Sequence, residues 1–267
     1  MNKINNIFLK KKILIYGLGK SGISTYNFLR HKAKVNLFDD NPKNNFRFDE
    51  KSLSFTKILK CDFDFIIISP GIDFSKCKLS KYLKQNSSKV YTDLDVFYSF
   101  FGNDSVTITG TNGKSTTAKL LYDVLRDQKK DARLVGNIGN PILSEKKIIK
   151  KTFFVIEASS YQLEYSKIFK SKYSVILNIT PDHIERHKNF KNYVDAKFRL
   201  LDSQTSQSVG FVKINDPVII KKLRSKKYKQ RIIKIDTSLQ PPIFKKIINK
   251  YFMSVSYTHL RAHETDY

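Results

Sequence analysis

Two glycine-rich turns, each directly after an apolar run of strand length, constrain the fold of this chain more than any other feature. The first turn, YGLGKSG at 16–22, ends the run ILIY and matches the G-x-G-x-x-G pattern of a dinucleotide-binding turn. The second, GTNGKST at 110–116, follows VTIT and precedes a segment of helical spacing. Because such turns hold phosphate on the N-terminus of the following helix, the sequence predicts two phosphate-binding loops.

Apolar runs of strand length alternate with helical segments along the chain. The runs lie at 12–16, 35–38, 63–69, 106–109, 153–157 and 173–179. Several are apolar almost throughout, as strands buried on both faces are, and helical spacing at 21–31 and 114–128 separates them. The pattern predicts an α/β protein, with an N-terminal Rossmann-like parallel-sheet domain followed by a P-loop-type α/β domain.

A domain boundary is expected near Thr92, between the strand KVY and the helix DLDVFYSF. It divides the chain into a Rossmann-like domain at 1–92 and an ATP-binding domain at 93–250. The tail at 251–267 includes SVSYTHLRAHETDY, which has neither Lys nor Ile although both abound elsewhere. We expect this tail to be foreign to the fold or disordered.

Composition excludes several classes of protein. The chain is 40% hydrophobic and 13% aromatic, which is too much for a disordered chain. The formal charge is +25, but the lysines are scattered, so no nucleic-acid partner is expected. No apolar run approaches the roughly 20 residues of a membrane span, and the N-terminus lacks a signal core, so we expect no membrane partner and a cytoplasmic location. The two cysteines, Cys61 and Cys77, form neither a disulfide framework nor a metal motif.

The second turn is a shortened version of the standard P-loop, because Ile108 stands where that pattern requires glycine. Its physics survives: glycines turn backbone amides toward phosphate oxygens, Lys114 supplies positive charge, and a hydroxyl of Ser115 or Thr116 can ligate Mg²⁺. The residues predicted to bind the phosphates of a nucleotide, which the resemblance given below implies to be ATP, are Gly110, Thr111, Asn112, Gly113, Lys114, Ser115 and Thr116. A turn that only begins a helix is the alternative.

Acidic and imidazole groups follow two of the predicted strands. Glu157 ends the run FFVIE, where a carboxylate near the ATP loop is suited to hold Mg²⁺, although a helix cap or a salt bridge would also account for it. The run YSVILNI leads into TPDHIERH. Within that segment His183 is closest to the strand, so it is preferred over His187 for a metal or phosphate contact.

An ordered series of motifs resembles the Mur ligase family of peptidoglycan synthesis. The series is GLGKSG, SPGI, GTNGKSTT, GNIGNP, EASSYQLE, LNITPDHIERH and DAKFRLL, and it runs from about residue 12 to about residue 216. In that family the N-terminal domain binds the UDP part of the substrate, the central domain binds ATP, and a C-terminal domain brings the amino acid.

The resemblance also implies roles for individual residues. Lys114 would contact ATP phosphates, Ser115 and Glu157 would hold a first Mg²⁺, and His183 would hold a second. Lys197, in DAKFRLL, matches the lysine that reacts with CO₂ to become a carbamate close to the metal. The implied catalytic residues are therefore Lys114, His183 and Lys197, and the implied metal ligands are Ser115, Glu157, His183 and Lys197.

The implied substrate site draws on both domains. Its residues are Leu18, Gly19, Lys20, Ser21, Asp39, Asp40, Ser69, Gly71, Asn137, Ser159 and Gln162. The segment 18–21 would lie near the diphosphate, Asp39 or Asp40 near the uridine, and the last three residues along the path of the muramoyl-alanine group.

The reaction implied is ATP-dependent amide formation through an acyl phosphate, with ATP and Mg²⁺ as cofactors. The implied partners are UDP-N-acetylmuramoyl-L-alanine, D-glutamate and ATP, and the protein would act as a monomer. The resemblance fades after residues 213–217, whereas family members continue through a third domain. We therefore expect an incomplete ATP-binding domain, an absent amino-acid-binding domain and a chain inactive as a ligase by itself.

Three other readings compete with this one. An NAD-dependent oxidoreductase is supported by Asp39 and Asp40, which lie about 20 residues after the glycines, but it leaves GTNGKST unexplained. Another Mur ligase or a folylpolyglutamate-type ligase would share the ATP loop. A nucleic-acid-binding module would need clustered charge with interleaved aromatics, which the basic run at 221–231 does not offer.

Overall fold

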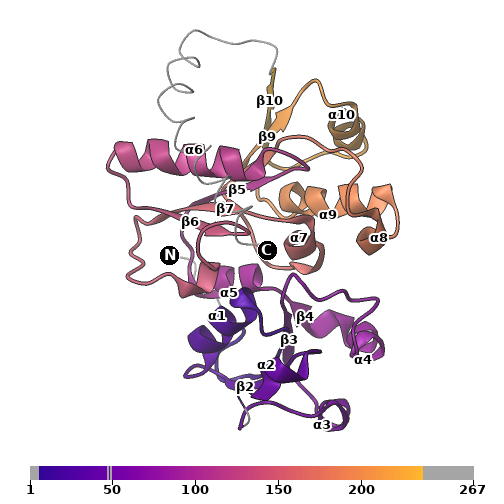
Figure 1. The fold of residues 1–267 in the computed structure, drawn as a ribbon. Helices are drawn as coiled ribbons and strands as arrows, with labels where there is room; N and C mark the ends of the chain where they lie inside the picture. The colour runs from indigo at the N-terminus through magenta and orange to yellow at the C-terminus, as the bar shows by residue number, and fades with distance from the viewer. Residues whose placement is uncertain (1–5, 47, 49, 237–267) are drawn as a thin grey trace, which may run out of the picture.

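The computed structural model describes residues 6–46, 48 and 50–236, and their elements form two parallel sheets with helix α5 (Asp93–Phe100) between them (Figure 1). The first sheet has the order β2-β1-β3-β4. Its strands are β1 (Lys12–Tyr16), β2 (Lys34–Phe38), β3 (Phe65–Ile68) and β4 (Val90–Tyr91). Its helices are α1 (Lys20–Leu29), α2 (Pro42–Phe46), α3 (Phe55–Leu59), α4 (Ser80–Gln85) and the 3-10 turn η1 (Ser87–Lys89).

The second sheet has six strands in the order β10-β9-β8-β5-β7-β6. The strands are β5 (Ser105–Thr109), β6 (Ala132–Gly136), β7 (Phe153–Glu157), β8 (Tyr173–Ile176), β9 (Val209–Lys213) and β10 (Arg231–Ile235). The helices are α6 (Lys114–Asp127), α7 (Ser160–Tyr165), α8 (Ile184–His187), α9 (Phe190–Asp202) and α10 (Pro217–Arg224), with the 3-10 turn η2 (Ile142–Ser144).

Every pairing in both sheets is parallel, which confirms the predicted α/β fold. In the first sheet β1 lies between β2 and β3, and in the second β5 lies between β7 and β8. The strand order therefore changes direction beside β1 and beside β5. In parallel sheets such switch points open a crevice at the carboxyl ends of the strands, and the two glycine-rich turns follow these two strands.

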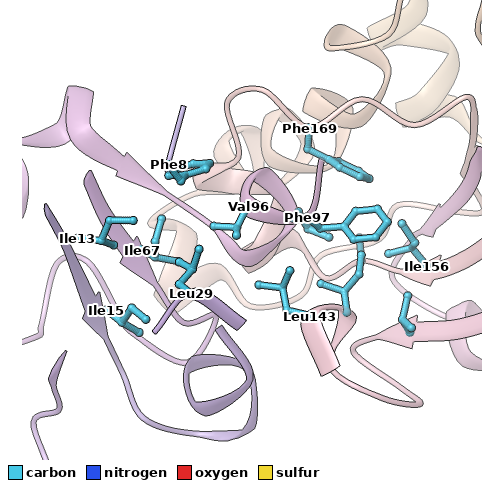
Figure 2. Close-up of a cluster of buried hydrophobic side chains, with 14 of the residues drawn as sticks. Phe8, Ile13, Ile15, Leu29, Ile67, Val96, Phe97, Leu143, Ile156 and Phe169 are labelled. Atoms are coloured by element: carbon cyan, nitrogen blue, oxygen red, sulfur yellow. The ribbon is translucent and has the colours of Figure 1, made fainter. Parts of the chain in front are cut away.

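Helix α5 joins the two sheets through a continuous apolar core. Its residues Leu94, Val96 and Phe97 are buried in one cluster with Ile13 and Ile67 of the first sheet, and Leu143, Phe154 and Ile156 of the second domain belong to the same cluster (Figure 2). The helix starts with a capping box between Thr92 and Asp95. Because both sheets pack on one short helix, their relative position is set by apolar packing.

The structure differs from the sequence expectations in the second sheet. Strands β6, β9 and β10 carry charged or glycine residues within their apolar runs, so the sequence did not single them out. The run at 173–179 is a strand only to Ile176, and its last residues form the loop that leads to α8. The tail at 251–267 lies outside the described residues.

Two remaining observations concern the whole described chain. Both cysteines are free thiols, Cys77 buried and Cys61 partly so. Among the helices of residues 6–236, none combines the length and the apolarity that a membrane crossing requires.

Candidate active site

Four loops meet at the carboxyl edge of the second sheet. They follow β6, β7, β5 and β8, which include three directly adjacent pairs in the sheet order. They carry Asn137 after β6, Glu157 at the end of β7, the glycine turn 110–113 after β5, and His183 before α8. Residues that are far apart in the sequence therefore converge on one edge, as the parallel fold requires.

The turn after β5 has the backbone of a phosphate loop. Gly113 precedes α6 with φ of 81°, and Gly110 has φ of 155°. Residues other than glycine rarely adopt such φ angles, which explains why glycine occupies both positions. The first amides of α6 have no acceptor within the helix, so they are available to phosphate oxygens at the positive end of its dipole.

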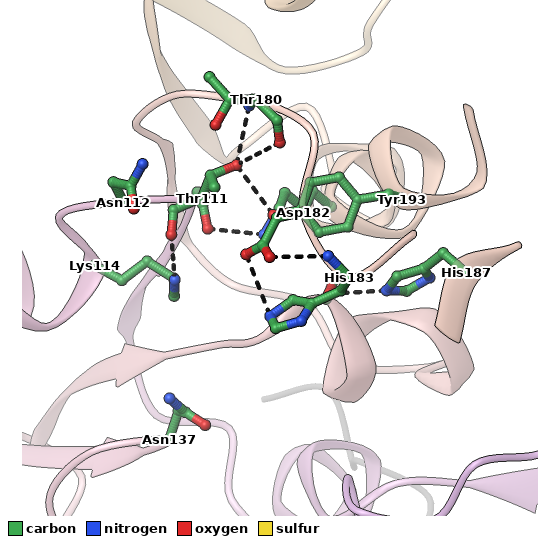
Figure 3. Close-up of polar contacts among 12 residues, drawn as sticks. Thr111, Asn112, Lys114, Asn137, Thr180, Asp182, His183, His187 and Tyr193 are labelled. Atoms are coloured by element: carbon green, nitrogen blue, oxygen red, sulfur yellow. Dashed lines mark hydrogen bonds and ion pairs between the residues drawn. The ribbon is translucent and has the colours of Figure 1, made fainter. Parts of the chain in front are cut away.

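The same turn is fastened to the loop after β8 (Figure 3). The amide of Thr111 donates to the carbonyl oxygen of Asn178 (2.9 Å), and the amide of Asn112 donates to Oδ1 of Asn178 (2.8 Å). The hydroxyl of Thr111 donates to the carbonyl oxygen of Thr180 (3.1 Å) and lies 3.0 Å from the hydroxyl of Tyr193. The amides of Thr111 and Asn112 are thus already occupied, which leaves those of 114–116 for phosphate.

Two lysines lie at this turn in different surroundings. Lys114 Nζ donates to the carbonyl oxygen of Thr111 (2.7 Å), so its side chain folds over the turn. Lys197, on α9, is 2% exposed and donates from Nζ to the carbonyl oxygen of Gly110 (2.8 Å), 4.5 Å from the ring centre of Tyr193. Burial, followed by the positive charge of Lys114, lowers the pKa of Lys197 to about 7.

Glu157 has one carboxylate oxygen in a hydrogen bond and one without a hydrogen-bond partner among the described residues. Its Oε1 accepts from Nδ2 of Asn137 (3.0 Å), while Oε2 has no hydrogen-bond partner among the described residues. The side chain is fully buried. A buried carboxylate oxygen without a partner is unfavourable, and a cation beside it would offset that cost. Glu157 therefore fits a ligand of Mg²⁺, which prefers oxygen donors.

The two histidines of the segment before α9 differ in exposure. His183 has φ of 52° and an exposed side chain, with Nε2 3.3 Å from Oδ2 of Asp182. His187 is enclosed between the rings of Tyr161 and Tyr193. Desolvation, followed by nearby positive charges, lowers the pKa of His187 to about 4. His183 is thus open to a metal or phosphate, and His187 is a neutral packing residue.

Ser160, His187 and Glu164 are aligned in a way that resembles a hydrolase triad. Nε2 of His187 lies 2.9 Å from Oγ of Ser160, and its Nδ1 lies 3.7 Å from Oε2 of Glu164. Ser160 is only 2% exposed, so no substrate carbonyl reaches its hydroxyl. The contacts among these three side chains connect α7 to α8, and Ser160 is too buried to act as a nucleophile.

A cavity of about 380 Å³ lies between the two domains, at the first glycine turn. It is lined by predicted substrate residues of both domains, namely Gly19, Lys20, Ser21, Asp39, Ser69, Gly71, Asn137 and Gln162. Gly17, Pro70, Ile72, Gly136, Gly139 and Pro141 complete the lining. The cavity thus combines an apolar lining with a few polar side chains at a helix N-terminus, which suits a phosphorylated ligand.

Three predicted substrate residues do not line this cavity. Leu18 is buried in the apolar core, and Ser159 caps α7 by accepting from the amide of Gln162. Asp40 accepts from the hydroxyl of Tyr16 (2.6 Å) and from the amide of Lys78 (3.2 Å). These contacts give the three residues supporting roles beside the cavity.

Asp39 does line the cavity, but both of its carboxylate oxygens are engaged. One accepts from the amide of Leu18 (2.5 Å) and the other from the amide of Asn41 (2.8 Å). The carboxylate therefore braces the glycine turn and has less capacity for the hydroxyls of a ribose. This weakens the argument for NAD that its position in the sequence offers.

Several residues of the site were not singled out in the sequence. Asn178 fastens the glycine turn after β5, residues 110–116, which is called the ATP turn below, and Arg186 contacts the other domain. Asp93 is buried beside Ser21 of the first turn, and desolvation raises its pKa to about 6 against the opposing hydrogen bonds of Ser21 and Leu94. No motif in the sequence marks Asp93 or Arg186, because only the packing of the two domains gives them their partners.

Two parallel sheets, each with a glycine-rich turn after the strand at its switch point, define an α/β fold of the nucleotide-binding class. The family model described as the Mur ligase middle domain matches residues 108–265. Since this match covers more than half of the chain, the chain belongs to the Mur ligase family.

Bacterial relatives agree with this assignment. A UDP-N-acetylmuramoylalanine--D-glutamate ligase from Rickettsia bellii is 36% identical over 216 residues, which covers 79% of this chain and 47% of that protein. A protein of the same name from a Thermoanaerobacter species is 36% identical over 221 residues, covering 78% and 48%. The chain thus spans about half the length of these relatives.

Solved structures agree on the fold. The UDP-N-acetylmuramate:L-alanyl-gamma-D-glutamyl-meso-diaminopimelate ligase from Neisseria meningitides superposes with a TM-score of 0.54 at 14% identity, covering 84% of this chain and 77% of that one. At that identity the likeness concerns the architecture alone.

Proposed function

We propose that this chain provides the UDP-substrate and ATP sites of a ligase that adds D-glutamate to UDP-N-acetylmuramoyl-L-alanine. The observation that carries the proposal is the cavity at the first glycine turn, which Asn137 of the second domain also lines, together with the hydrogen bond from Asn137 to Glu157 at the sheet edge where the second turn lies. The names and identities of the relatives above support the substrates. The cytoplasm, where nucleotide precursors occur, is the proposed location, and a monomer is the proposed state.

In this proposal the two domains divide the substrates. The first turn and the segment 69–72 hold the diphosphate of the UDP substrate, with positive helix ends and Lys20 opposite its charge. Asn137 and Gln162, from the second domain, line the same cavity, and Asn137 donates to Glu157 at the end of β7, the strand beside β5. The terminal carboxylate of the alanyl group would thereby be directed to the γ-phosphate of ATP.

The chemistry proceeds in two displacements. The alanyl carboxylate attacks the γ-phosphorus, a phosphorus–oxygen bond forms, and ADP departs. The amine of D-glutamate then attacks the acyl phosphate, loses a proton, and expels phosphate as the amide forms. Lys114 and the amides of 114–116 stabilise the charge on the transferring phosphoryl group, which is the main contribution such a site makes.

Mg²⁺ would be held by Glu157 Oε2 and the hydroxyl of Ser115, with His183 as ligand of a second ion. The open, buried oxygen of Glu157 fits this assignment. When bound, the ion neutralises phosphate charge. The described residues contain no cluster of three His, Cys, Asp or Glu side chains, so backbone, hydroxyl and phosphate oxygens would complete the coordination.

Lys197 is proposed to form the carbamate that the family resemblance implies. Its amine is buried against the ATP turn, where the neutral form that attacks CO₂ is favoured by burial. The reaction forms a nitrogen–carbon bond and releases one proton. A carbamate keeps one N–H, so the hydrogen bond to the carbonyl oxygen of Gly110 can persist.

Calorimetric titration tests the proposal on the 267-residue chain. UDP-N-acetylmuramoyl-L-alanine and ATP with Mg²⁺ are expected to bind, each with one site, while NADH and a short DNA duplex give no heat. Binding is the appropriate readout because the chain spans about half the length of its relatives. Tight binding of NADH, with no response to the UDP substrate, would overturn the proposal in favour of an oxidoreductase.

A further inference from the structure

Arg186 joins the ATP-binding domain to the loop that lines the substrate cavity. Its guanidinium Nη2 donates to the carbonyl oxygens of Ile72 (2.5 Å) and Pro70 (3.3 Å). Arg186 belongs to α8, three residues after His183, whereas Pro70 and Ile72 follow β3 of the first domain. One side chain thus bridges the two domains at the cavity.

The guanidinium is held on its own side as well. Its carbon Cζ lies 4.4 Å from the ring centre of Tyr161 on α7, and the ring of Tyr161 also contacts that of His183. Glu164 and Asp73 lie close enough to interact with the positive charge electrostatically. The guanidinium of Arg186 is held in place by the ring of Tyr161. Its hydrogen bonds to the two carbonyl oxygens therefore cost little additional side-chain entropy.

The loop that Arg186 holds is packed tightly on the first glycine turn. Oγ of Ser69 donates to the carbonyl oxygen of Gly17 (2.6 Å). A Cβ placed on Gly17 would lie 2.9 Å from side-chain atoms of both Ile72 and Ser69, so these two side chains occupy the space that any residue other than glycine would need. Displacement of the loop would therefore change the turn that faces the diphosphate.

From these contacts we infer that Arg186 is a positioning residue for the UDP substrate. It fixes the segment 69–72 against the first glycine turn and ties it to the segment 182–187 at the ATP side. This inference rests on the proposed function, since it concerns the same cavity. Arg186 is thus a residue of the second domain, outside the phosphate loops, that controls the affinity of the first domain for its ligand.

The domain interface does not depend on Arg186 alone. Phe74 and Tyr165 stack across it with ring centres 4.8 Å apart at an angle of 12°. Lys167 of the second domain donates to the carbonyl oxygens of Ser87 (2.6 Å) and Ser88 (2.7 Å) of the first. Lys167 lies outside the cavity lining, so it is a matched control: a cation of one domain on two carbonyls of the other.

The test compares Arg186→Gln, Arg186→Lys and Lys167→Gln by titration with UDP-N-acetylmuramoyl-L-alanine and, separately, with ATP and Mg²⁺. Arg186→Gln is expected to weaken UDP-substrate binding about tenfold, because it removes two charge-assisted hydrogen bonds to the loop, and to leave ATP affinity within twofold. Arg186→Lys should give an intermediate loss, since an ammonium cannot form the planar fork. Lys167→Gln should leave both affinities unchanged.

The outcomes separate the inference from the proposed function. Equal binding of the UDP substrate by wild type and Arg186→Gln overturns the inference alone. An equal loss in Lys167→Gln also overturns it, because the effect would then belong to domain docking in general. Absence of UDP-substrate binding by the wild-type chain overturns the proposed function and the inference together.

Discussion

The ammonium group of Lys197 lies 2.8 Å from the carbonyl oxygen of Gly110, so the buried face of α9 contacts the first glycine of the ATP turn. Among the lysines at described positions, Lys197 differs physically: its side chain is enclosed, and its pKa is lowered to about 7. Enclosure beside the glycine turn makes the neutral amine about as abundant as the ammonium form near neutral pH, which an exposed lysine does not offer.

Lys197 should therefore be modified by CO₂. Incubation with ¹³C-bicarbonate is expected to give one carbamate carbon resonance in the NMR spectrum, which is absent from Lys197→Arg. Lys191→Arg, on the exposed face of the same helix, should retain the resonance. Persistence of the signal in Lys197→Arg would show that another amine is modified.

Lys114→Ala should abolish detectable ATP binding, with a loss of about 100-fold or more in affinity. The ammonium group carries the only lysine charge of the turn at 110–116, and it donates a hydrogen bond to the carbonyl oxygen of Thr111. Lys119→Ala is the matched control, because Lys119 lies on the same helix and pairs with Asp123. Calorimetry with ATP and Mg²⁺ checks both variants. Unchanged ATP affinity in Lys114→Ala would show that the turn only begins a helix and does not bind phosphate.

Lys114 and Lys197 also show how much of the site could be predicted from the sequence. The position of Lys114 follows from a local motif, and the strands that flank it follow from apolar runs, so both could be predicted. Asn178 and Arg186 could not be singled out, because their partners lie more than 60 residues away and are backbone atoms. Backbone acceptors leave no pattern in the sequence. The burial of Lys197 likewise depends on how α9 packs, which periodicity alone does not specify.

Asp93→Asn should change the pH dependence of stability. Folding raises the pKa of Asp93 from 3.8 to about 6, mainly through desolvation. The folded state therefore binds more protons than the unfolded state between about pH 4 and 6, and this residue's contribution to stability falls as pH rises through that window. Asn removes the charge and keeps an oxygen for the amide of Leu94.

The stability advantage of Asp93→Asn over wild type should thus grow from near zero at pH 4 to at most about 3 kcal/mol at pH 7. Urea denaturation at both pH values measures it, and Glu185→Gln serves as an exposed control. A constant difference between variant and wild type across this range would contradict the assignment.

Gly22→Ala should destabilise the chain strongly, whereas Gly19→Ala should not. A Cβ on Gly22 would lie 1.8 Å from the carbonyl oxygen of Gly17, but a Cβ on Gly19 would meet no atom within 4 Å. The clash forces α1 away from the turn, at a cost of about 2–3 kcal/mol. Thermal unfolding of the two variants without ligand tests this, and equal midpoints would show that the turn relaxes freely.

Asp95→Ala should cost about 3–4 kcal/mol, because a single buried carboxylate serves both domains. One of its oxygens accepts from the amide and hydroxyl of Thr92, which caps α5. The other accepts from the amides of 167–169 and from the hydroxyl of Ser166, at 2.8–3.0 Å. Alanine leaves these amides buried without an acceptor, whereas Ser166→Ala removes only one hydroxyl and should cost about 1 kcal/mol. Urea denaturation distinguishes the two: similar losses would mean that water enters the space left by Asp95 and replaces its oxygens.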